Sequence, residues 1–308
     1  MADKVVVFGG AGFLGSHVAD RLSDKGYEVY IFDIKPSCYI RPNQKMIVAD
    51  IMDLYAVESA VKGARFVYAF SGIAGIKDAS DEPLRTVRLN ILGTAHILDA
   101  ACRMNVERVV FASSLYVYSD LGSFYRSSKQ ACELLIEDYH KMYDLDYTIL
   151  RFGSLYGDRA NEFNYLRQAI LQAFTEARIS RKGDGEEIRE YVHVRDAASA
   201  SVEILDDRHL NRHVMITGAQ AIKVKDMLAM IQEMMGNKIQ IEYTSDRLEE
   251  HYKTTPFSFS PRVAEKYFGQ SHLDLNTGLL DLIQRTYEEL RVHNKLLAVD
   301  LEHLQSQH

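Results

Sequence analysis

The chain has 308 residues, of which 47% are hydrophobic and 26% are charged, and its formal net charge is −7. This size and composition predict a globular protein with a well-buried core, and the acidic balance disfavours nucleic acid as a partner. Three widely spaced cysteines, Cys38, Cys102 and Cys132, form no CxxC pair, so we expect neither a disulfide framework nor a metal site. No apolar run approaches the roughly 20 residues of a membrane span, and Met1 leads straight into a strand-like run, which predicts a cytoplasmic protein.

The first half of the chain alternates strand-like and helix-like segments. Short apolar runs predict strands at 4–8, 28–32, 45–49, 66–70, 108–113 and 147–150. Apolar residues at helical spacing predict helices at 13–25, 53–62, 83–104 and 125–143. This alternation is typical of right-handed βαβ units, so we predict an α/β fold built on a Rossmann-type doubly wound parallel sheet. In such folds ligands bind beyond the carboxyl ends of the strands.

The pattern loosens after residue 155. Helices are predicted at 161–178, 196–205 and 224–234, with a strand at 213–217 and a charged, glycine-bearing stretch at 181–190. The final stretch, 295–308, has the pattern of a terminal helix, to which we assign no function. We therefore predict a larger domain over residues 1–155, to which a segment near 190–220 returns, and a smaller mixed α/β domain over residues 156–308.

The sequence GGAGFLG, residues 9–15, lies between the first predicted strand and the first predicted helix. In this setting backbone N–H groups and the helix dipole can meet a pyrophosphate. Gly9 permits the tight turn, Gly12 lets the backbone approach the phosphates, and Gly15 allows close packing of helix on strand. The loop therefore predicts a dinucleotide site.

An acidic residue, Asp33, ends the second predicted strand. A carboxylate at that point accepts hydrogen bonds from both hydroxyls of an adenosine ribose and repels a 2′-phosphate, which favours NAD over NADP. Phe13 and Leu14 at the start of the helix, and Asp50 and Ile51 after the third strand, belong to the predicted cofactor site. Tyr125 and Lys129, further along the chain, are also expected to contact the cofactor.

The sequence YRSSK, residues 125–129, places Tyr125 and Lys129 on one face at the start of a predicted helix. A phenol has a pKa of about 10 and is a poor base at neutral pH, but a neighbouring ammonium favours the phenolate. The pair therefore indicates general-base catalysis of alcohol oxidation. The preceding strand ends in Ser113 and Ser114, where a hydroxyl can hydrogen-bond the reacting oxygen of a substrate.

The Gly-x-x-Gly-x-x-Gly spacing resembles the short-chain dehydrogenase/reductase superfamily, and the chain length resembles its extended branch of NAD-dependent nucleotide-sugar epimerases and dehydratases. SSLYVY, residues 113–118, is similar to the Ser-Ser-x-x-Val-Tyr pattern of epimerases of the UDP-glucose 4-epimerase kind, whose second hydroxyl is catalytic. The resemblance, which covers residues 4 to 270, implies a catalytic triad of Ser114, Tyr125 and Lys129. It leaves Ser113 a supporting role.

Other segments extend the resemblance. GDGEEIREYVHVRDAA, residues 183–198, is similar to the family's sugar-nucleotide segment, which implies that Arg189 contacts the diphosphate of a nucleotide-diphosphate sugar and that Arg247 does so from a second position. Ser154 stands where most relatives place an asparagine of the sugar-nucleotide site, and His193 is expected to be packed or exposed rather than catalytic. LNILGTAHILDAA, residues 89–101, is similar to the family's helix beside the cofactor, which implies a homodimer through helices 83–104 and 125–143.

Two departures from the family pattern bear on the reaction. Ten residues, Leu115 to Phe124, connect Ser114 to Tyr125 where relatives have a longer loop, so we expect a reshaped substrate pocket. Sugar dehydratases of the family follow the triad hydroxyl with Asp-Glu, whereas this chain has Leu115 and Tyr116, which disfavours elimination of water.

We therefore expect an NAD-dependent nucleotide-sugar epimerase that acts at C4 of a UDP-hexose or UDP-hexuronate through a transient 4-keto sugar. Two alternatives stay open on the residues alone. One is an NAD(P)-dependent nucleotide-sugar reductase, dehydrogenase or dehydratase. The other is a non-catalytic dinucleotide-binding protein on the same fold.

Overall fold

The described part of the computed structural model comprises residues 2–244, 253, 265–267 and 273–292. Its largest element is an eight-stranded sheet with the order β13-β10-β6-β5-β4-β1-β2-β3, in which every pairing is parallel. The strands are β1 (Lys4–Phe8), β2 (Glu28–Asp33), β3 (Gln44–Val48), β4 (Phe66–Ala69), β5 (Arg108–Ser114), β6 (Asp146–Phe152), β10 (Arg212–Ile216) and β13 (Glu265–Lys266). The chain proceeds outwards in both directions from β1, which confirms the predicted Rossmann-type doubly wound sheet and places its switch point between β1 and β4.

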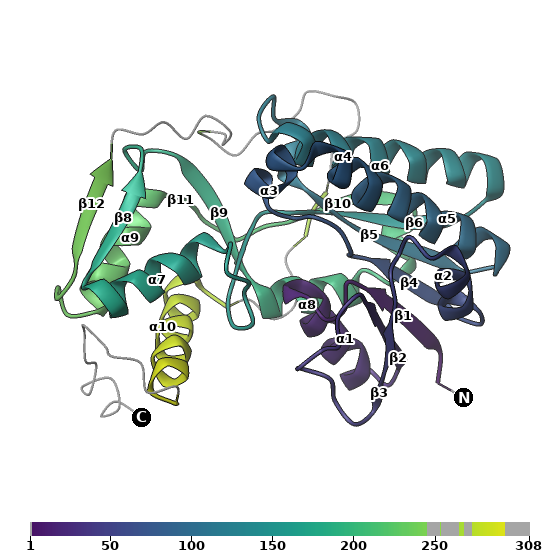
Figure 1. Ribbon diagram of the computed structural model, residues 1–308, viewed down its shortest axis with the longest axis horizontal. Helices are drawn as coiled ribbons and strands as arrows, with labels where there is room; N and C mark the ends of the chain where they lie inside the picture. The colour runs from purple at the N-terminus through teal and green to yellow at the C-terminus, as the bar shows by residue number, and fades with distance from the viewer. Residues whose placement is uncertain (1, 245–252, 254–264, 268–272, 293–308) are drawn as a thin grey trace.

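Helices cover both faces of this sheet (Figure 1). α2 (Leu54–Val61), α5 (Gly93–Arg103) and α6 (Ser123–Tyr143) lie on one face, and α1 (Phe13–Asp24) and α8 (Val194–Glu203) lie on the other. Alternate residues of β1 therefore enter two hydrophobic clusters, Val6 and Phe8 on the α5 side and Val5 and Val7 on the α1 side. All four are fully buried, which is why this strand is an uninterrupted apolar run in the sequence.

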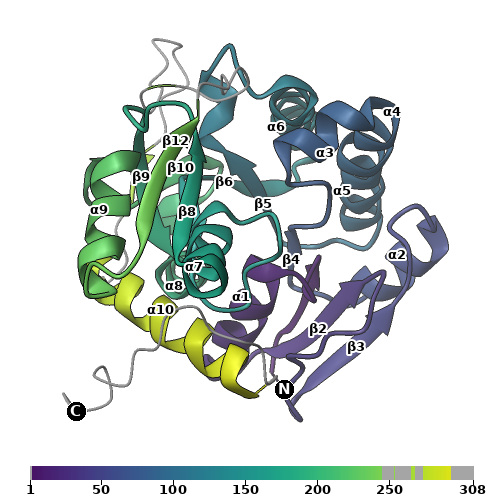
Figure 2. The same cartoon turned by 60° about the vertical axis from the view of Figure 1, so that its left-hand side comes forward.

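A second group of elements lies to one side of the sheet, at the left of Figure 1. It contains α7 (Tyr165–Glu176), β8 (Arg178–Lys182), α9 (Val224–Met234), β12 (Gln240–Thr244) and α10 (Leu275–Val292). These elements share a hydrophobic cluster that includes Ile170, Ile231 and Ile283, and Figure 2 shows α10 alongside α7 and α9. A small sheet of β11 (Ala221–Lys223), β9 (Ile188–His193) and β7 (Ser154–Tyr156) lies between this group and the central sheet.

One predicted helix has an irregular centre. The segment 83–104 consists of α4 (Pro83–Thr86), a π-helical turn η1 (Val87–Leu92) and α5. Within η1 the side chain of Asn90 is buried, accepts a hydrogen bond from the backbone N–H of Ile73 at 2.7 Å, and donates to Ser128 Oγ at 2.9 Å. The π turn thus places Asn90 so that it bonds two segments that are distant in the sequence. The spacing of apolar residues in the helix does not predict these contacts.

Several other elements differ from the predictions at their ends. α7 begins at Tyr165 rather than at 161, because the Asn164 side chain caps it by accepting a hydrogen bond from the backbone N–H of Arg167 at 3.2 Å. α3 (Ile76–Asp81) and α10 were not predicted, and the stretch 295–308 lies outside the described residues. Within the described part of the chain, no helix has the length and apolarity to cross a bilayer.

Arg108, the first residue of β5, joins the sheet to the end of α8. Its side chain is 1% exposed. Nη1 donates to the backbone carbonyls of Ile204, Leu205 and Asp206 at 3.3, 3.2 and 3.4 Å, and Nη2 donates to Asp207 Oδ1 at 3.0 Å. The guanidinium therefore binds the carbonyl of Ile204, the C-cap of α8, and the carbonyls of the two residues that follow it.

We expect Arg108→Ala to lower the free energy of unfolding by about 3 kcal/mol or more, because it removes buried charge-assisted hydrogen bonds and leaves a cavity. Arg103→Ala is the matched control, since that arginine pairs with Glu58 and Asp99 on the surface and its loss costs below about 1 kcal/mol. Urea unfolding followed by circular dichroism measures both. Equal losses in the two variants would contradict the capping role.

Candidate active site

A cavity of about 770 Å³ opens at the carboxyl ends of the central strands. It is lined by residues that follow β1, β2, β4, β5 and β6, and by residues of α7, β8 and β9 on the opposite side. Every sequence-predicted site residue within the described part of the chain lines this cavity: Gly9, Gly12, Phe13, Leu14, Gly15, Asp33, Asp50, Ile51, Ser114, Tyr125, Lys129, Ser154 and Arg189. Arg247 lies outside the described residues.

The glycine loop between β1 and α1 has no room for side chains. Gly9 has a φ of +75°, and a Cβ there would lie 2.7 Å from the backbone N of Ser71. A Cβ on Gly15 would lie 2.2 Å from the carbonyl oxygen of Gly9. α1 has no side-chain cap and no acidic residue in its first turn, so its N-terminal N–H groups and positive dipole end suit an anion at the cavity wall.

The acidic residues after β2 and β3 shape the neighbouring wall. The Asp33 carboxylate accepts hydrogen bonds from the backbone N–H of Ala11 at 3.1 Å and of Lys35 at 3.3 Å, which ties the end of β2 to the glycine loop. Asp50 Oδ1 accepts a hydrogen bond from the N–H of Met52 at 2.9 Å, which holds the turn that carries Ile51.

Ser114, Tyr125 and Lys129 meet where β5 ends and α6 begins. Ser114 is the last residue of β5, and its hydroxyl oxygen accepts a hydrogen bond from the backbone N–H of Tyr116 at 3.3 Å. The buried Lys129 donates from Nζ to the carbonyl of Ala112 at 2.7 Å, and Nζ lies 5.8 Å from the centre of the Tyr125 ring. Burial lowers the pKa of the Lys129 ammonium.

The short connection between Ser114 and Tyr125 contributes an aromatic side chain to the cavity wall. Residues Leu115–Tyr118 form a 3₁₀ turn, η2, and the Tyr116 ring lies in the cavity wall, edge-on to the Tyr125 ring at 6.2 Å between centres. Gly122 has a φ of +100°, and a Cβ there would lie 2.6 Å from the Tyr116 ring. Leu115 is buried against Met215. The pair Leu115 and Tyr116 therefore brings a phenol and no carboxylate to this part of the cavity.

Several residues that line the cavity are not predicted from the sequence. Arg181 of β8 stacks on the ring of Tyr165 at 4.4 Å and pairs with Glu187. Burial raises the pKa of Tyr165 to about 12. Asn164 and Arg85 also line the cavity. The charged stretch 181–190 was a signal for Arg181, whereas no local pattern brings α7 to this wall.

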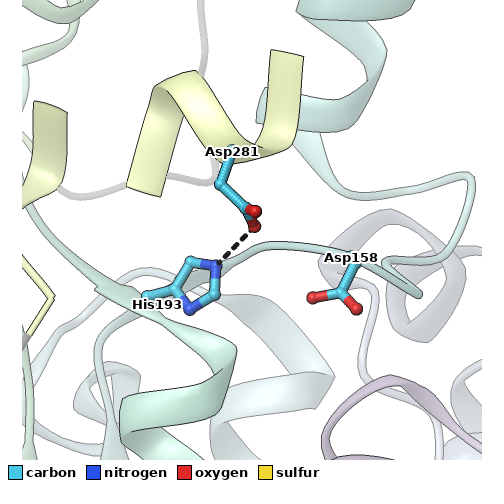
Figure 3. Close-up of side chains that lie close together, drawn as sticks. All are labelled: Asp158, His193 and Asp281. Atoms are coloured by element: carbon cyan, nitrogen blue, oxygen red, sulfur yellow. Dashed lines mark ion pairs between the residues drawn. The ribbon is translucent and has the colours of Figure 1, made fainter. Parts of the chain in front are cut away.

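His193 lies apart from the cavity lining, in a cluster with Asp158 and Asp281 (Figure 3). Its Nδ1 accepts a hydrogen bond from the backbone N–H of Arg195 at 3.3 Å, so Nε2 carries the proton, and Nε2 lies 4.0 Å from Asp281 Oδ2. Arg195 lies 3.5 Å from Asp158 and 3.6 Å from Asp281, and Arg285 lies 3.0 Å from Asp281. Guanidinium groups already balance both carboxylates, and this tautomer turns a proton rather than a lone pair toward them, which disfavours a metal ion.

Burial lowers the pKa of His193 to about 4, from an ordinary value of 6.5. Because the folded-state pKa lies below the unfolded one, the unfolded chain binds the proton first as the pH falls, and stability decreases from pH 6.5 downwards. Between pH 6.5 and pH 4, we expect the free energy of unfolding of the wild type to fall by up to about 3 kcal/mol more than that of His193→Asn. Urea unfolding at a series of pH values measures both, and parallel pH profiles would contradict the expectation.

Known proteins of one family resemble this chain over most of its length. The model of the NAD dependent epimerase/dehydratase family matches residues 5–217. The chain is 26% identical over 298 residues to a putative UDP-glucose 4-epimerase of Methanocaldococcus jannaschii, covering 89% of this chain and 95% of that protein. It is also 26% identical over 276 residues to a UDP-N-acetyl-alpha-D-glucosaminuronate decarboxylase of Bacillus cytotoxicus, covering 80% and 83%. Its fold is similar to the crystal structure of UDP-glucose 4-epimerase with UDP-glucose from Thermotoga maritima, with a TM-score of 0.83, 21% identity and coverage of 93% and 99%.

Proposed function

Because the chain belongs to the NAD dependent epimerase/dehydratase family, we propose that it inverts the configuration at C4 of a nucleotide-diphosphate sugar, a UDP-hexose or UDP-hexuronate, through a transient 4-keto sugar. The observation that carries this proposal is the presence of Ser114, Tyr125 and Lys129 on one cavity wall, where no described lining residue beside them is a carboxylate. NAD, when bound in the cavity, would supply the redox chemistry for oxidation of the sugar and for its later reduction.

The glycine loop and the ends of β2 and β3 would hold NAD. The crowding at Gly9 and Gly15 and the uncapped N-terminus of α1 fit a pyrophosphate, with Gly12, Phe13 and Leu14 alongside it. Asp33 would hold the hydroxyls of the adenosine ribose, and Asp50 and Ile51 would border the adenine. These assignments are supported by the common cavity that the residues line.

The three side chains at the end of β5 have distinct proposed roles. Tyr125 takes the proton of the 4-hydroxyl as the sugar is oxidised and gives it back on reduction. Lys129 holds a positive charge near the Tyr125 ring and so favours the phenolate. Ser114 donates a hydrogen bond to the reacting oxygen and stabilises its change in charge.

The cavity chemistry favours epimerisation over elimination. Among the described residues that line the cavity, the carboxylates are Asp33 and Asp50, which lie at the end of β2 and after β3 rather than near β5. Elimination of water needs an acid and a base beside the sugar, and Leu115 and Tyr116 supply neither a carboxylic acid nor a carboxylate. Epimerisation needs only the triad and a retained cofactor.

The second group of elements would bind the rest of the substrate, so we assign nucleotide-sugar binding mainly to residues 156–308 and NAD binding to 1–155 with the segment near 190–220. The guanidinium groups of Arg189 and Arg181 suit a diphosphate, and Ser154 lies within the same cavity. Arg247 stays a candidate for a second diphosphate contact.

The decisive experiment incubates the protein with UDP-glucose, UDP-glucuronate and their N-acetyl relatives and separates the products by chromatography. We expect a 4-epimer from one of them, and Tyr125→Phe should lower the turnover number at least about 100-fold while NAD is still released on denaturation. Tyr143→Phe, an exposed tyrosine on the same helix, is the matched control and should retain activity.

The outcomes separate the candidate functions. NAD-loaded protein that forms no 4-epimer from any of these sugars would overturn the proposal. A lasting change in nicotinamide absorbance would indicate a reductase or dehydrogenase instead, and release of carbon dioxide would indicate a decarboxylase.

We also propose a homodimer through the surface of α4, η1, α5 and α6. This surface carries exposed aliphatic side chains at Leu84, Val87, Leu92 and Leu134, and Leu84 is 84% exposed. Apolar side chains gathered on neighbouring helices favour association. The partner expected to cover them is a second copy of the chain.

Light scattering after size exclusion should give twice the chain mass of 35.1 kDa. The double variant Leu92→Asp/Leu134→Asp should give the single-chain mass, because it places charges within the proposed interface. Tyr55→Asp, which changes a residue that is 86% exposed on α2, is the control and should leave the mass unchanged. A monomeric wild type would refute the dimer.

A further inference from the structure

Glu133 lies one helical turn beyond Lys129 and two turns beyond Tyr125 on the same side of α6, since the three positions are four residues apart. The residue is 6% exposed. Its Oε1 accepts hydrogen bonds from Ser113 Oγ at 2.5 Å and from Arg151 Nε at 3.0 Å, and its Oε2 accepts one from Arg151 Nη2 at 2.6 Å. One carboxylate thus joins α6 to both β5 and β6.

The bonds continue from Arg151 to further buried groups. Arg151 is 3% exposed, donates to the hydroxyl of Tyr118 in η2, and places Nη2 2.9 Å from Nδ1 of His213 in β10. Nε2 of His213 lies 3.3 Å from Oε1 of Glu137, on the next turn of α6. We call this set the Glu133 network: Ser113, Tyr118, Glu133, Glu137, Arg151 and His213.

A buried ion pair is a poor source of stability. The cost of removing both charges from water largely cancels their attraction, and apolar side chains of similar volume are often as stable or more so. Stability is therefore a weak reason for a Glu133–Arg151 pair at this place. Their position relative to the site supplies another reason for them.

Two successive turns of α6 hold two successive residues of β5. Lys129 donates to the carbonyl of Ala112, and Glu133 accepts from the side chain of Ser113. The next residue of the strand is Ser114. Together the two contacts fix the helix against the strand at the point where the proposed triad assembles.

We infer that Glu133 is a positioning residue of the proposed epimerase, which holds the end of β5 against α6 and so sets Ser114 relative to Tyr125 and Lys129. The inference rests on the proposed function. Glu133 does not line the cavity, so it acts through Ser113 and through its charge rather than by touching the sugar.

The charge of Glu133 has a specific consequence for Lys129. Burial lowers the pKa of Lys129, and the charges of Cys132 and Glu133 act to raise it. Without the carboxylate, Lys129 would lose its proton at a lower pH. The Tyr125 phenolate would then lack its stabilising cation, and the pKa of Tyr125 would rise.

The test is Glu133→Gln, which keeps the size of the side chain and an acceptor for Ser113 but removes the charge. We expect the turnover number for epimerisation to fall about tenfold or more with KM little changed, since the loss falls on the chemical step. The phenolate absorbance of NAD-loaded protein, taken as the difference from a matched Tyr125→Phe background, should titrate at a higher pH than in the wild type. That titration needs no sugar.

Glu137→Gln is the matched control, because it removes a buried carboxylate that lies one turn further along α6, beside His213 of β10. We expect its turnover number and phenolate titration to match the wild type. If Glu133→Gln does not fold, the double variant Glu133→Met/Arg151→Met removes both charges at similar volume and should fold with the same loss of turnover.

A wild-type turnover number and an unshifted phenolate titration in folded Glu133→Gln protein would overturn the inference. An equal loss in Glu137→Gln would also overturn it, because the effect would then be one of general stability. A wild type that forms no 4-epimer would overturn the proposed function, whereas the phenolate titration would still decide whether Glu133 controls Tyr125.

Discussion

The central sheet is covered by helices on both faces, and this constraint decides where polar side chains can lie. The interiors of β1 and β4 are apolar because each of their residues meets a helix layer. Polar groups such as Asp33, Ser113 and Ser114 occur where strands end. Since parallel strands end at one edge, the covered sheet collects these groups into one cavity, and the crossing of chain order between β1 and β4 leaves room for a ligand there.

The sequence predicted the parts of this arrangement that have a local cause. Strands buried on both faces are continuous apolar runs, so the predicted bounds of β1, β2 and β5 are close to the observed ones. The motif around Gly9 lies after β1, and those around Ser114 and Tyr125 lie at and beyond the end of β5. Each motif lies at the end of a strand or the start of a helix. The predicted fold therefore suffices to place the motifs at the same edge of the sheet.

The residues that the sequence did not reveal depend on contacts between distant segments. Arg181 and Tyr165 reach the cavity because β8 and α7 pack on each other, and α7 carries no sequence pattern that predicts this contact. Glu133 follows the Tyr-x-x-x-Lys pair by one turn, but no sequence pattern predicts that it pairs with Arg151 of β6. α10 was missed because its apolar face has meaning only against α7 and α9.

Local charge at the cavity opposes the charge of the whole chain. The net charge is −7, yet the described residues that line the cavity bring Arg85, Lys129, Arg181 and Arg189 against Asp33 and Asp50. An anionic ligand responds to these nearby groups, because more distant surface charges are screened over about 10 Å at ordinary salt. The acidic composition therefore disfavours binding of a polyanion such as nucleic acid, and it is compatible with a phosphate pocket.

The π turn η1 gives the helix before α5 one residue more than an ideal α-helical path needs. An α-helix turns by about 100° per residue, so deletion of one residue from this turn could restore regular winding while rotating Asn90 away from Ile73 and Ser128. The loop after β4 and the start of α6 would then lose the hydrogen bonds to Asn90 that join them. A change of one residue in length, with little effect on composition or charge, would separate the cavity wall after β4 from the helix that carries Tyr125.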